Sequence, residues 1–212
     1  MVERADRSGD RSRNPQGEGA RLREELIAAA GRLLMKDGNP NSVSLRAIAR
    51  EAGVSAPSVY LQFESKDALL RAVVVEHFAA LQRATDERMT SGLDPVSSLY
   101  AGCLAYCHFA IEQPGAYRII FETPLPSSSA VAGEERLGMA AFQVLVDGIA
   151  SCIAAGVAKP ADPFAVATNV WNSMHGMVSL RQHLTRFPWP PIDDQLAGIL
   201  AALTGIDREA LT

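Results

Sequence analysis

Side chains with the chemistry to bind nucleic acid are concentrated between positions 44 and 66. The hydroxyl of Ser55 and the amide of Gln62 can hydrogen-bond to base edges in a major groove. The phenol of Tyr60 and the ammonium of Lys66 can hold phosphates, as can the free amides at a helix N-terminus. The candidate DNA-binding residues, including the small residues that let the backbone come close, are Ser44, Arg46, Ser55, Ala56, Pro57, Ser58, Tyr60, Gln62 and Lys66.

A second set of candidate residues is mostly aromatic and follows position 77. A single aromatic residue usually packs in a core, but a set with a few polar tips favours a pocket for a small apolar molecule. His175 lies four residues after Trp171 and could orient such a ligand; a histidine hydrogen-bonded inside a helical bundle is the simpler interpretation. The candidate ligand-binding residues are Phe78, Tyr106, Phe109, Tyr117, Phe121, Phe142, Trp171, Met174 and His175.

Two cysteines raise metal binding or redox sensing as an alternative. Cys103 and Cys107 lie one helical turn apart, and His108 follows, but it points away from their face. A complete zinc site needs more ligands, so buried reduced cysteines are the favoured interpretation. The sequence also contains no phosphate-binding glycine loop, nucleophile elbow or zinc-protease motif. We therefore expect no enzyme activity, no cofactor and no metal.

The 44–66 segment has residue sizes that suit two short helices crossing closely. Ser44 can cap a helix through Glu51, Gly53 permits a left-handed turn, and Ser55 can cap a third helix to about Leu61. Behind them, spacing of apolar residues predicts a first helix over 20–37. The shared core is expected to contain Leu45, Ile48, Val54 and Val59. A tight corner in any helical protein would share this pattern, so the corner alone does not establish a function.

The rest of the chain is also predicted to be helical. Helices are expected over 65–89, 96–112, 117–121, 137–156, 163–185 and 192–204, with Asp162 and Pro163 opening the fifth and Gly205 ending the last. No strand alternation is found. We predict an all-α protein with a disordered arm over 1–19, a helix-turn-helix DNA-binding domain over 20–66, and a ligand-binding and dimerisation domain over 67–212. The Pro/Ser/Gly-rich segment 123–133 is expected to be a mobile loop.

Composition limits where such a protein works. The net charge is −4, but residues 1–66 carry +2 and the remainder −6. Three cysteines without regular spacing suit a reducing cytoplasm, and no segment is apolar for long enough to predict a membrane span. Arginine outnumbers lysine 17 to 3, which suggests a GC-rich bacterial source. A cytoplasmic bacterial protein without a membrane partner is expected.

The run from Val43 to Val73 resembles the N-terminal domain of the TetR family of bacterial transcription regulators. The matching residues are Ser44-Leu-Arg-Ala-Ile-Ala, Ala52-Gly-Val-Ser, Val59-Tyr60, Phe63 and Lys66-Asp-Ala-Leu-Leu. The resemblance implies that Ser44, Tyr60 and Lys66 hold phosphates while residues 55–60 enter the groove. Gln62 departs from the family, which often has a basic residue or histidine there.

Further along, Trp171, His175 and Gly176 resemble the Trp-His-Gly signature of one TetR C-terminal subset, and the run from Gln113 to Phe121 is similar in style. The family's C-terminal domains bind a ligand and dimerise through two helices from each chain. The helix that begins at Pro163 is apolar nearly all round, so it has a face for a partner. The predicted dimer interface contains Val170, Met177, Val178, Leu196, Ile199 and Leu203.

Together these features predict a homodimeric repressor that leaves its palindromic double-stranded operator when a small apolar or aromatic molecule binds. Two alternatives remain: the same DNA-binding role with a cysteine redox or metal signal, and a small all-helical enzyme or binding protein.

Overall fold

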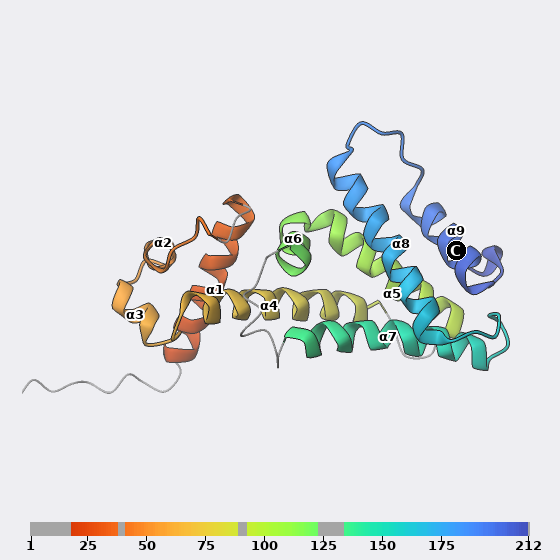
Figure 1. Ribbon diagram of the computed structural model, residues 1–212, viewed down its shortest axis with the longest axis horizontal. Helices are drawn as coiled ribbons and strands as arrows, with labels where there is room; N and C mark the ends of the chain where they lie inside the picture. Colours follow the sequence, from red (N-terminus) through yellow and green to blue (C-terminus); the bar gives the residue numbers. More distant parts are fainter. Residues whose placement is uncertain (1–17, 38–40, 89–92, 123–133, 212) are drawn as a thin grey trace, which may run out of the picture.

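The structure is a computed structural model that describes residues 18–37, 41–88, 93–122 and 134–211. All regular elements in these ranges are helices, so the predicted all-α class is confirmed (Figure 1). They are α1 (Glu18–Asp37), α2 (Leu45–Glu51), α3 (Ala56–Tyr60), α4 (Lys66–Asp86), α5 (Pro95–Glu112), α6 (Pro114–Glu122), α7 (Glu134–Ala154), α8 (Pro163–His183), α9 (Ile192–Thr204) and a 3₁₀ turn, η1 (Arg208–Ala210).

Helices α1 to α3 and the first half of α4 surround one core, which we call the N-terminal core. Its completely buried residues include Leu26, Ile48, Val59 and Leu69. Ser44 caps α2 by accepting a hydrogen bond from the amide of Ala47, as its position predicts. The backbone then turns at Gly53, whose φ of 70° favours glycine. These local signals fix the α2–α3 corner.

Helix α4 connects this core to the rest of the molecule. Ser65 caps it by accepting from the amide of Ala68, which confirms the predicted start. Leu69 belongs to the N-terminal core, whereas Leu81, three turns later, belongs to a second one, the C-terminal core. Figure 1 shows α4 running along the long axis of the molecule from α3 to the body, beside α7. A shift of one end of α4 therefore bears on both cores.

The C-terminal core is built on α5, which is packed by α4, α6, α7, α8 and α9. Asp162 caps α8 at the amide of Phe164, and Pro163 occupies the first turn, as predicted. Gly205 ends α9 with a φ of 73°. The chain then folds back so that Ile206 and Leu211 are buried in the same core.

Helix α6 is a second connection between the two cores. It packs against α1 and α4 as well as α5. Ile119 on one face lies in the N-terminal core, and Tyr117 and Ile120 lie in the C-terminal core. At its start Gly115 approaches α1 so closely that a β-carbon there would lie 2.7 Å from Cγ of Met35. A side chain on residue 115 would therefore push α6 or Met35 aside.

Several expectations need adjustment. Helix α1 begins at Glu18, two residues before the expected start, and α3 ends at Tyr60 instead of Leu61. Ser55 precedes α3 but makes no capping bond, because its hydroxyl pairs with that of Ser58 at 2.8 Å. The η1 turn was not expected. Of the arm predicted over 1–19, residues 18 and 19 belong to α1. Its residues 1–17, the Gly38 helix stop and the predicted loop over 123–133 lie outside the described residues. Among the described helices, none has the length and apolarity needed to cross a membrane.

Candidate nucleic-acid interface and ligand cavity

One side of the α2–α3 corner is open to solvent while the other is packed. Val59 is fully buried against the N-terminal core, whereas the next two residues, Tyr60 and Leu61, are 61% and 83% exposed. Ser55 and Pro57 are also exposed, and Ser58 is half-buried. Helix α3 therefore presents a short, polar edge with one projecting phenol. Such an edge lets a helix backbone come close to a groove.

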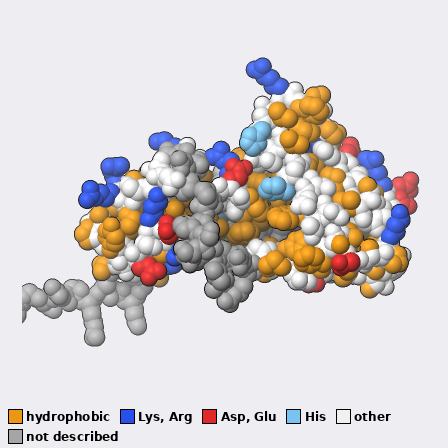
Figure 2. All heavy atoms as spheres, viewed as in Figure 1, with side chains coloured by type: hydrophobic (Ala, Val, Ile, Leu, Met, Phe, Trp, Pro, Cys, Tyr) orange, Lys and Arg blue, Asp and Glu red, His pale blue; other side chains and the backbone are white. Residues whose placement is uncertain are grey.

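The predicted phosphate-binding groups surround this edge. Arg46 is exposed in the first turn of α2, and Lys66 is the first residue of α4. The oxygen of Ser44 accepts from Ala47, which leaves its O–H available to donate. The space-filling view in Figure 2 shows several lysine and arginine side chains on the surface of the α1–α3 part. The structure thus brings the candidate DNA-binding residues to one corner of the chain.

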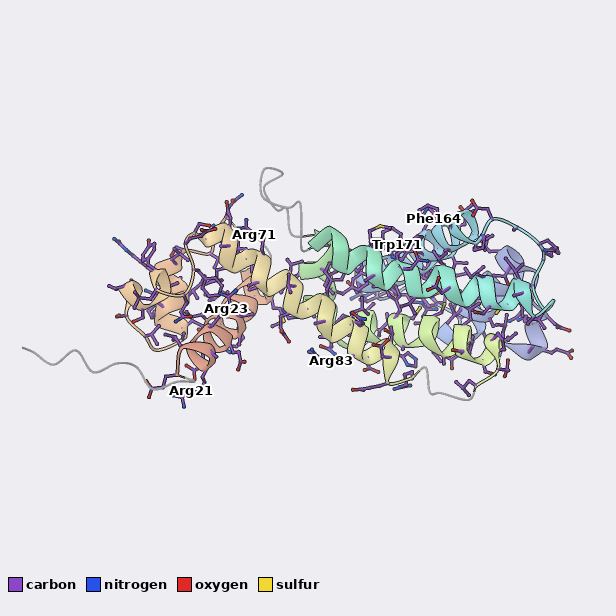
Figure 3. All side chains as sticks on the ribbon, turned by 90° about the horizontal axis from the view of Figure 1, so that it is seen from below. Arg21, Arg23, Arg71, Arg83, Phe164 and Trp171 are labelled. Atoms are coloured by element: carbon purple, nitrogen blue, oxygen red, sulfur yellow. The ribbon has the colours of Figure 1, made fainter. Side chains whose placement is uncertain are left out.

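Arg23 of α1 holds this corner in place, although it was not among the predicted residues. Its guanidinium donates to the carbonyl of Gln62 at 3.1 Å and lies 4.2 Å from the centre of the Phe63 ring. Figure 3 shows Arg23 within the α1–α3 part, far from Trp171 and Phe164 at the other end. Arg23 and Gln62 are 39 positions apart, so no local sequence pattern reveals the contact. Arg23 fixes the chain just after α3, which makes it a positioning residue for that edge.

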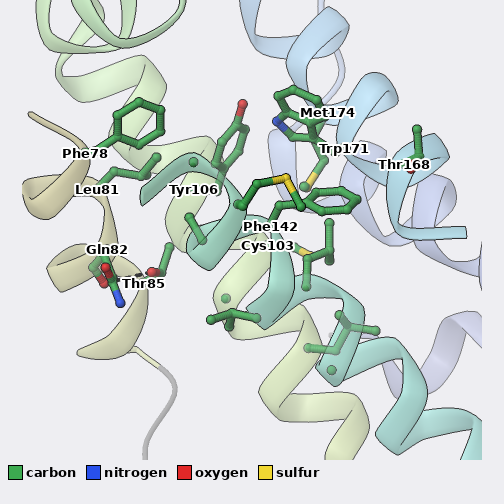
Figure 4. Close-up of a pocket in the computed structure, with 18 of the residues that line it drawn as sticks. Phe78, Leu81, Gln82, Thr85, Cys103, Tyr106, Phe142, Thr168, Trp171 and Met174 are labelled. Atoms are coloured by element: carbon green, nitrogen blue, oxygen red, sulfur yellow. Dashed lines mark hydrogen bonds between the residues drawn. The ribbon is translucent and has the colours of Figure 1, made fainter. Parts of the chain in front are cut away.

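A cavity of about 720 Å³ lies between α4, α5, α7 and α8, with Phe121 of α6 at its side (Figure 4). None of the described side chains that line it is charged. This volume falls within the range of small-molecule sites. The described lining residues are Phe78, Leu81, Gln82, Thr85, Leu99, Gly102, Cys103, Tyr106, Phe121, Gly138, Met139, Ala141, Phe142, Val144, Leu145, Gly148, Phe164, Thr168, Trp171 and Met174.

Six of the predicted ligand-binding residues line this cavity and three do not. Those that line it are Phe78, Tyr106, Phe121, Phe142, Trp171 and Met174. Phe109 is buried in the C-terminal core, and Tyr117 and His175 lie behind Tyr106. The lining residues that sequence reasoning missed are mainly small or aliphatic. Their helical spacing is the same as that of ordinary core residues, so the sequence carried no separate signal for them.

Phe121 ties the aromatic residues of the cavity together. Its ring centre lies 6.0 Å from that of Phe78 on α4, 6.3 Å from Trp171 on α8 and 4.7 Å from Tyr117 on its own helix. Trp171 in turn contacts Phe142 of α7 at 5.9 Å. Aromatic pairs at these separations attract each other beyond simple burial. A molecule that displaces any of these rings therefore pushes on α6.

A hydrogen-bonded chain leads away from the cavity wall. The hydroxyls of Tyr106 and Tyr117 are 2.7 Å apart, and the Tyr117 hydroxyl lies 2.5 Å from Nδ1 of His175. Burial raises the pKa of both tyrosines. Burial also lowers the pKa of His175 from 6.5, against the opposing effect of the Glu122 charge. All three groups are therefore uncharged at neutral pH.

Two family models match the two parts of the chain. Residues 26–73 match the model described as bacterial regulatory proteins of the tetR family, and residues 99–203 match the one described as the tetracyclin repressor-like C-terminal domain. The chain belongs to the TetR family. The resemblance of the Val43–Val73 run is thereby confirmed, while the Trp-His-Gly subset stays a prediction.

Other TetR-type proteins are similar in sequence or structure. An HTH-type transcriptional regulator of Mycobacterium tuberculosis is 29% identical over 150 residues, which cover 67% of this chain and 62% of that regulator. The HTH-type nicotine-responsive transcriptional repressor HdnoR of Paenarthrobacter nicotinovorans is 38% identical over 77 residues, covering 36% of this chain and 39% of the repressor. A solved protein of unknown function from Rhodococcus sp. RHA1 has a TM-score of 0.71 at 27% identity, covering 90% of this chain and 95% of the other.

The chain thus spans less than two thirds of the length of these curated relatives. The relatives with a named role are transcription regulators and not enzymes, as the absence of catalytic motifs led us to expect.

The cysteines of this TetR-family chain are packed thiols. Cys103, Cys107 and Cys152 are all free and buried. Burial raises the pKa of each, that of Cys107 to about 12, so the reactive thiolate is disfavoured. Within the described ranges no group of three or more His, Cys, Asp or Glu side chains could hold a metal ion. These observations give the redox or metal alternative no support.

The residues predicted to form the dimer interface differ in their exposure. Val170, Met177, Val178 and Leu196 are buried within the single chain, because their side of each helix packs on the C-terminal core. Their side chains therefore leave almost no surface for a partner in this arrangement. Ile199 is half-buried, and Leu203 is 36% exposed. An apolar stripe shows that a helix needs cover, but it does not say whether the cover comes from the same chain.

Acidification is expected to destabilise this TetR-family fold below about pH 6.5. Burial lowers the pKa of both His175 and His77 below 6.5, so the unfolded chain binds protons that the folded chain refuses. Stability is then full above 6.5 and falls as the pH drops toward the folded pKa values, by up to about 1.4 kcal/mol per pH unit for each histidine. Urea unfolding of His175→Asn between pH 5 and 8 checks this. The plot of unfolding free energy against pH should be flatter for His175→Asn than for the wild type or for a variant of an exposed histidine, His183→Asn. An unchanged slope would contradict a lowered pKa for His175.

Proposed function

We propose that this TetR-family protein is a sequence-specific DNA-binding transcription regulator, most simply a repressor that a small apolar or aromatic molecule releases from a palindromic operator. One observation carries the proposal. The exposed polar edge of α3 is carried by the N-terminal core, and the cavity, whose described lining is uncharged, adjoins the C-terminal core. Helices α4 and α6 contribute to both cores. A ligand in the cavity touches both connecting helices, through Phe78 and Phe121. Binding at one site is thereby coupled mechanically to the other.

On DNA, we assign base contacts to Ser55, Ser58 and Gln62 and phosphate contacts to Ser44, Arg46, Tyr60 and Lys66. The exposed Ser55 and the half-buried Ser58 and Gln62, in and beside α3, support the first assignment. The hydrogen-bond donors on neighbouring α2 and α4 support the second. Ala56 and Pro57 complete the close approach. The domain division follows the same logic, with residues 20–66 carrying DNA contacts and residues 67–212 carrying the cavity.

A homodimer is proposed because one α3 edge reads only one half-site. Helices α8 and α9 have outward faces on which Gly176 and Gly198 have no atom within 4 Å of a β-carbon position. Leu180, one turn after Gly176 on α8, is 50% exposed, and Leu203 in the last turn of α9 is 36% exposed. Small and exposed apolar residues on two neighbouring helices suit a close four-helix contact with a second copy. This outward face replaces the buried residues of the sequence prediction.

Repression of transcription and release by a ligand are proposed because a relative is named for both properties. HdnoR, by its name, is a repressor that responds to nicotine. The cavity in this chain is aromatic and uncharged among its described lining, which suits a small apolar or aromatic effector of unknown identity. A cytoplasmic location fits a protein that works on DNA.

Selection of bound duplexes from a random pool tests the proposal directly. The full chain should enrich a two-fold-related sequence with half-sites about 10 base pairs or a multiple of that apart. Light scattering at micromolar concentration should give twice the 22.7 kDa chain mass. Enrichment of no palindrome, or a monomer at that concentration, would count against a dimeric operator binder. A reporter placed behind the selected site then shows whether bound protein lowers or raises transcription.

Replacing Lys66 with alanine is expected to reduce the salt dependence of DNA binding. Each phosphate contact releases counterions, so the slope of log affinity against log salt should lose about one unit per reading head. Binding to all DNA sequences should be weakened alike, because phosphate contacts carry no base information. Fluorescence anisotropy across a salt series measures this. Lys159→Ala is the matched control, since exposed Lys159 lies after α7, far from α3. An unchanged slope for Lys66→Ala would remove it from the phosphate set.

A further inference from the structure

The cavity wall has few polar groups, and their hydrogen bonds differ. Thr85 donates its O–H to the carbonyl of Gln82 at 2.8 Å, and Thr168 donates to that of Phe164 at 2.9 Å. Both threonine hydrogens are thus committed to their own helices. The other polar side chains of the described lining are Gln82, Tyr106 and Trp171.

Tyr106 differs from the threonines because it and its partner Tyr117 can exchange the roles of donor and acceptor. A hydroxyl can donate or accept, and so can neutral imidazole, depending on its tautomer. When Nδ1 of His175 accepts from Tyr117, Tyr117 accepts from Tyr106. When Nδ1 carries the proton and donates, Tyr117 donates to Tyr106, and the Tyr106 O–H is released toward the cavity. The two short contacts, 2.7 and 2.5 Å, keep either direction satisfied.

Trp171 adds a fixed donor beside this hydroxyl. Figure 4 shows the indole nitrogen of Trp171 turned toward Tyr106 at the upper part of the cavity. An indole N–H only donates. The Trp171 N–H hydrogen-bonds to the Tyr106 oxygen. The Tyr106 O–H is therefore the donor in this region that can turn toward a ligand. Gln82 lies on α4, away from this pair in the same view.

We propose that the cavity takes an uncharged, mainly apolar molecule with one acceptor oxygen, as in a ketone, ester or amide, and that Tyr106 binds this oxygen with Tyr117 and His175 orienting its hydroxyl. The proposal rests on the ligand-binding role proposed above and names its chemistry. A carboxylate or ammonium would lose its hydration without gaining a counter-charge from the described lining, which is costly. The aromatic rings accept the rest of the molecule.

Four matched probes test the proposal by calorimetry on the full-length chain at neutral pH. They are the ketone hexanophenone, the hydrocarbon hexylbenzene, the carboxylate 6-phenylhexanoate and the cation 6-phenylhexylammonium. We expect the ketone to bind and each ion to bind at least about tenfold more weakly than it. Tyr106→Phe should weaken the ketone about threefold to tenfold, the effect of one lost hydrogen bond, and leave hexylbenzene within about twofold. Tyr100→Phe is the matched control and should spare the ketone, because Tyr100 lies on α5 outside the described lining. Gln82→Leu tests the alternative that Gln82 binds the oxygen.

Three results would overturn the proposal. They are an ion that binds as tightly as the ketone, a Tyr106→Phe effect equal for ketone and hydrocarbon, and a loss of ketone binding in Gln82→Leu but not in Tyr106→Phe. Thermal melting of Tyr106→Phe verifies that this variant keeps its fold. Failure of all the probes to bind is a fourth result that refutes this ligand class. The DNA selection described above is independent of it, so the regulator assignment fails only if that selection fails.

Discussion

An aspartate at position 55 is expected to weaken operator binding about a hundredfold for each reading head without harming the fold. Ser55 is exposed at the start of α3 and makes no capping bond, and aspartate is at least as good an N-cap as serine. In the groove, however, its carboxylate meets phosphates. Repulsion of about 1 kcal/mol from each of two or three phosphates gives about a hundredfold per head. Anisotropy with the selected duplex measures the loss, and thermal melting should show no drop.

Ser151→Asp is the control for this substitution. Ser151 is an exposed serine on α7 that bonds only within its own helix, to the carbonyl of Asp147. The variant has the same net charge as Ser55→Asp but places it far from α3. If both variants lowered DNA affinity equally, general charge repulsion would explain the effect. If Ser55→Asp bound normally, α3 would not be the reading helix.

The DNA-facing corner could be predicted from the sequence because its signals are local. The caps at Ser44 and Ser65 and the turn at Gly53 act within a few residues, and the structure has all three. Arg23 was missed because its contact with Gln62 depends on how α1 packs against α2 and α4. Crossing of helices is set by packing of the whole core, which a spacing rule does not describe.

The cavity was only partly predictable, for a related reason. Aromatic residues were easy to single out, and five of the predicted ones line it, but Leu99 and Gly148 do so too and look like any core residue. Tyr117 carried an aromatic signal yet lies behind the wall. The dimer face shows the same limit, since Val170 and Leu180 are both apolar on α8 while only Leu180 is exposed. Burial within one chain and burial between chains leave the same pattern in the sequence.

Saturating ligand is expected to lower operator affinity by about fivefold to 150-fold, and saturating operator DNA to lower ligand affinity by the same factor. This range corresponds to a coupling of about 1 to 3 kcal/mol, and equality of the two factors is required by linkage. The physical route is short. Phe78 lies just past the middle of α4, which begins at Lys66. Phe121 lies in the last turn of α6, and Ile119 of the same helix lies in the N-terminal core.

A ligand that displaces these two rings must therefore move the helices on which the α2–α3 corner rests. Because a dimer has to match two groove positions at once, a small change in the angle of α4 misaligns both heads and removes several contacts together. Close packing of Gly115 on Met35 leaves α6 little room to absorb the motion alone. The displacement is thus passed to α1, which carries Arg23 and so the end of α3.

Trp171→Ala distinguishes a ligand that acts from the cavity from one that competes with DNA directly at the α3 edge. Trp171 lines the cavity and touches Phe121 and Phe142, but it is far from α3, so the variant should bind operator normally and lose most of its response to ligand. Trp189→Ala is the matched control, because Trp189 follows α8 and is not part of the described cavity lining. Paired titrations, ligand with and without DNA and DNA with and without ligand, give both factors, and a melting curve excludes a collapsed core. If ligand saturated the wild type and operator affinity did not change, the cavity would not control DNA binding, however well the ligand fits.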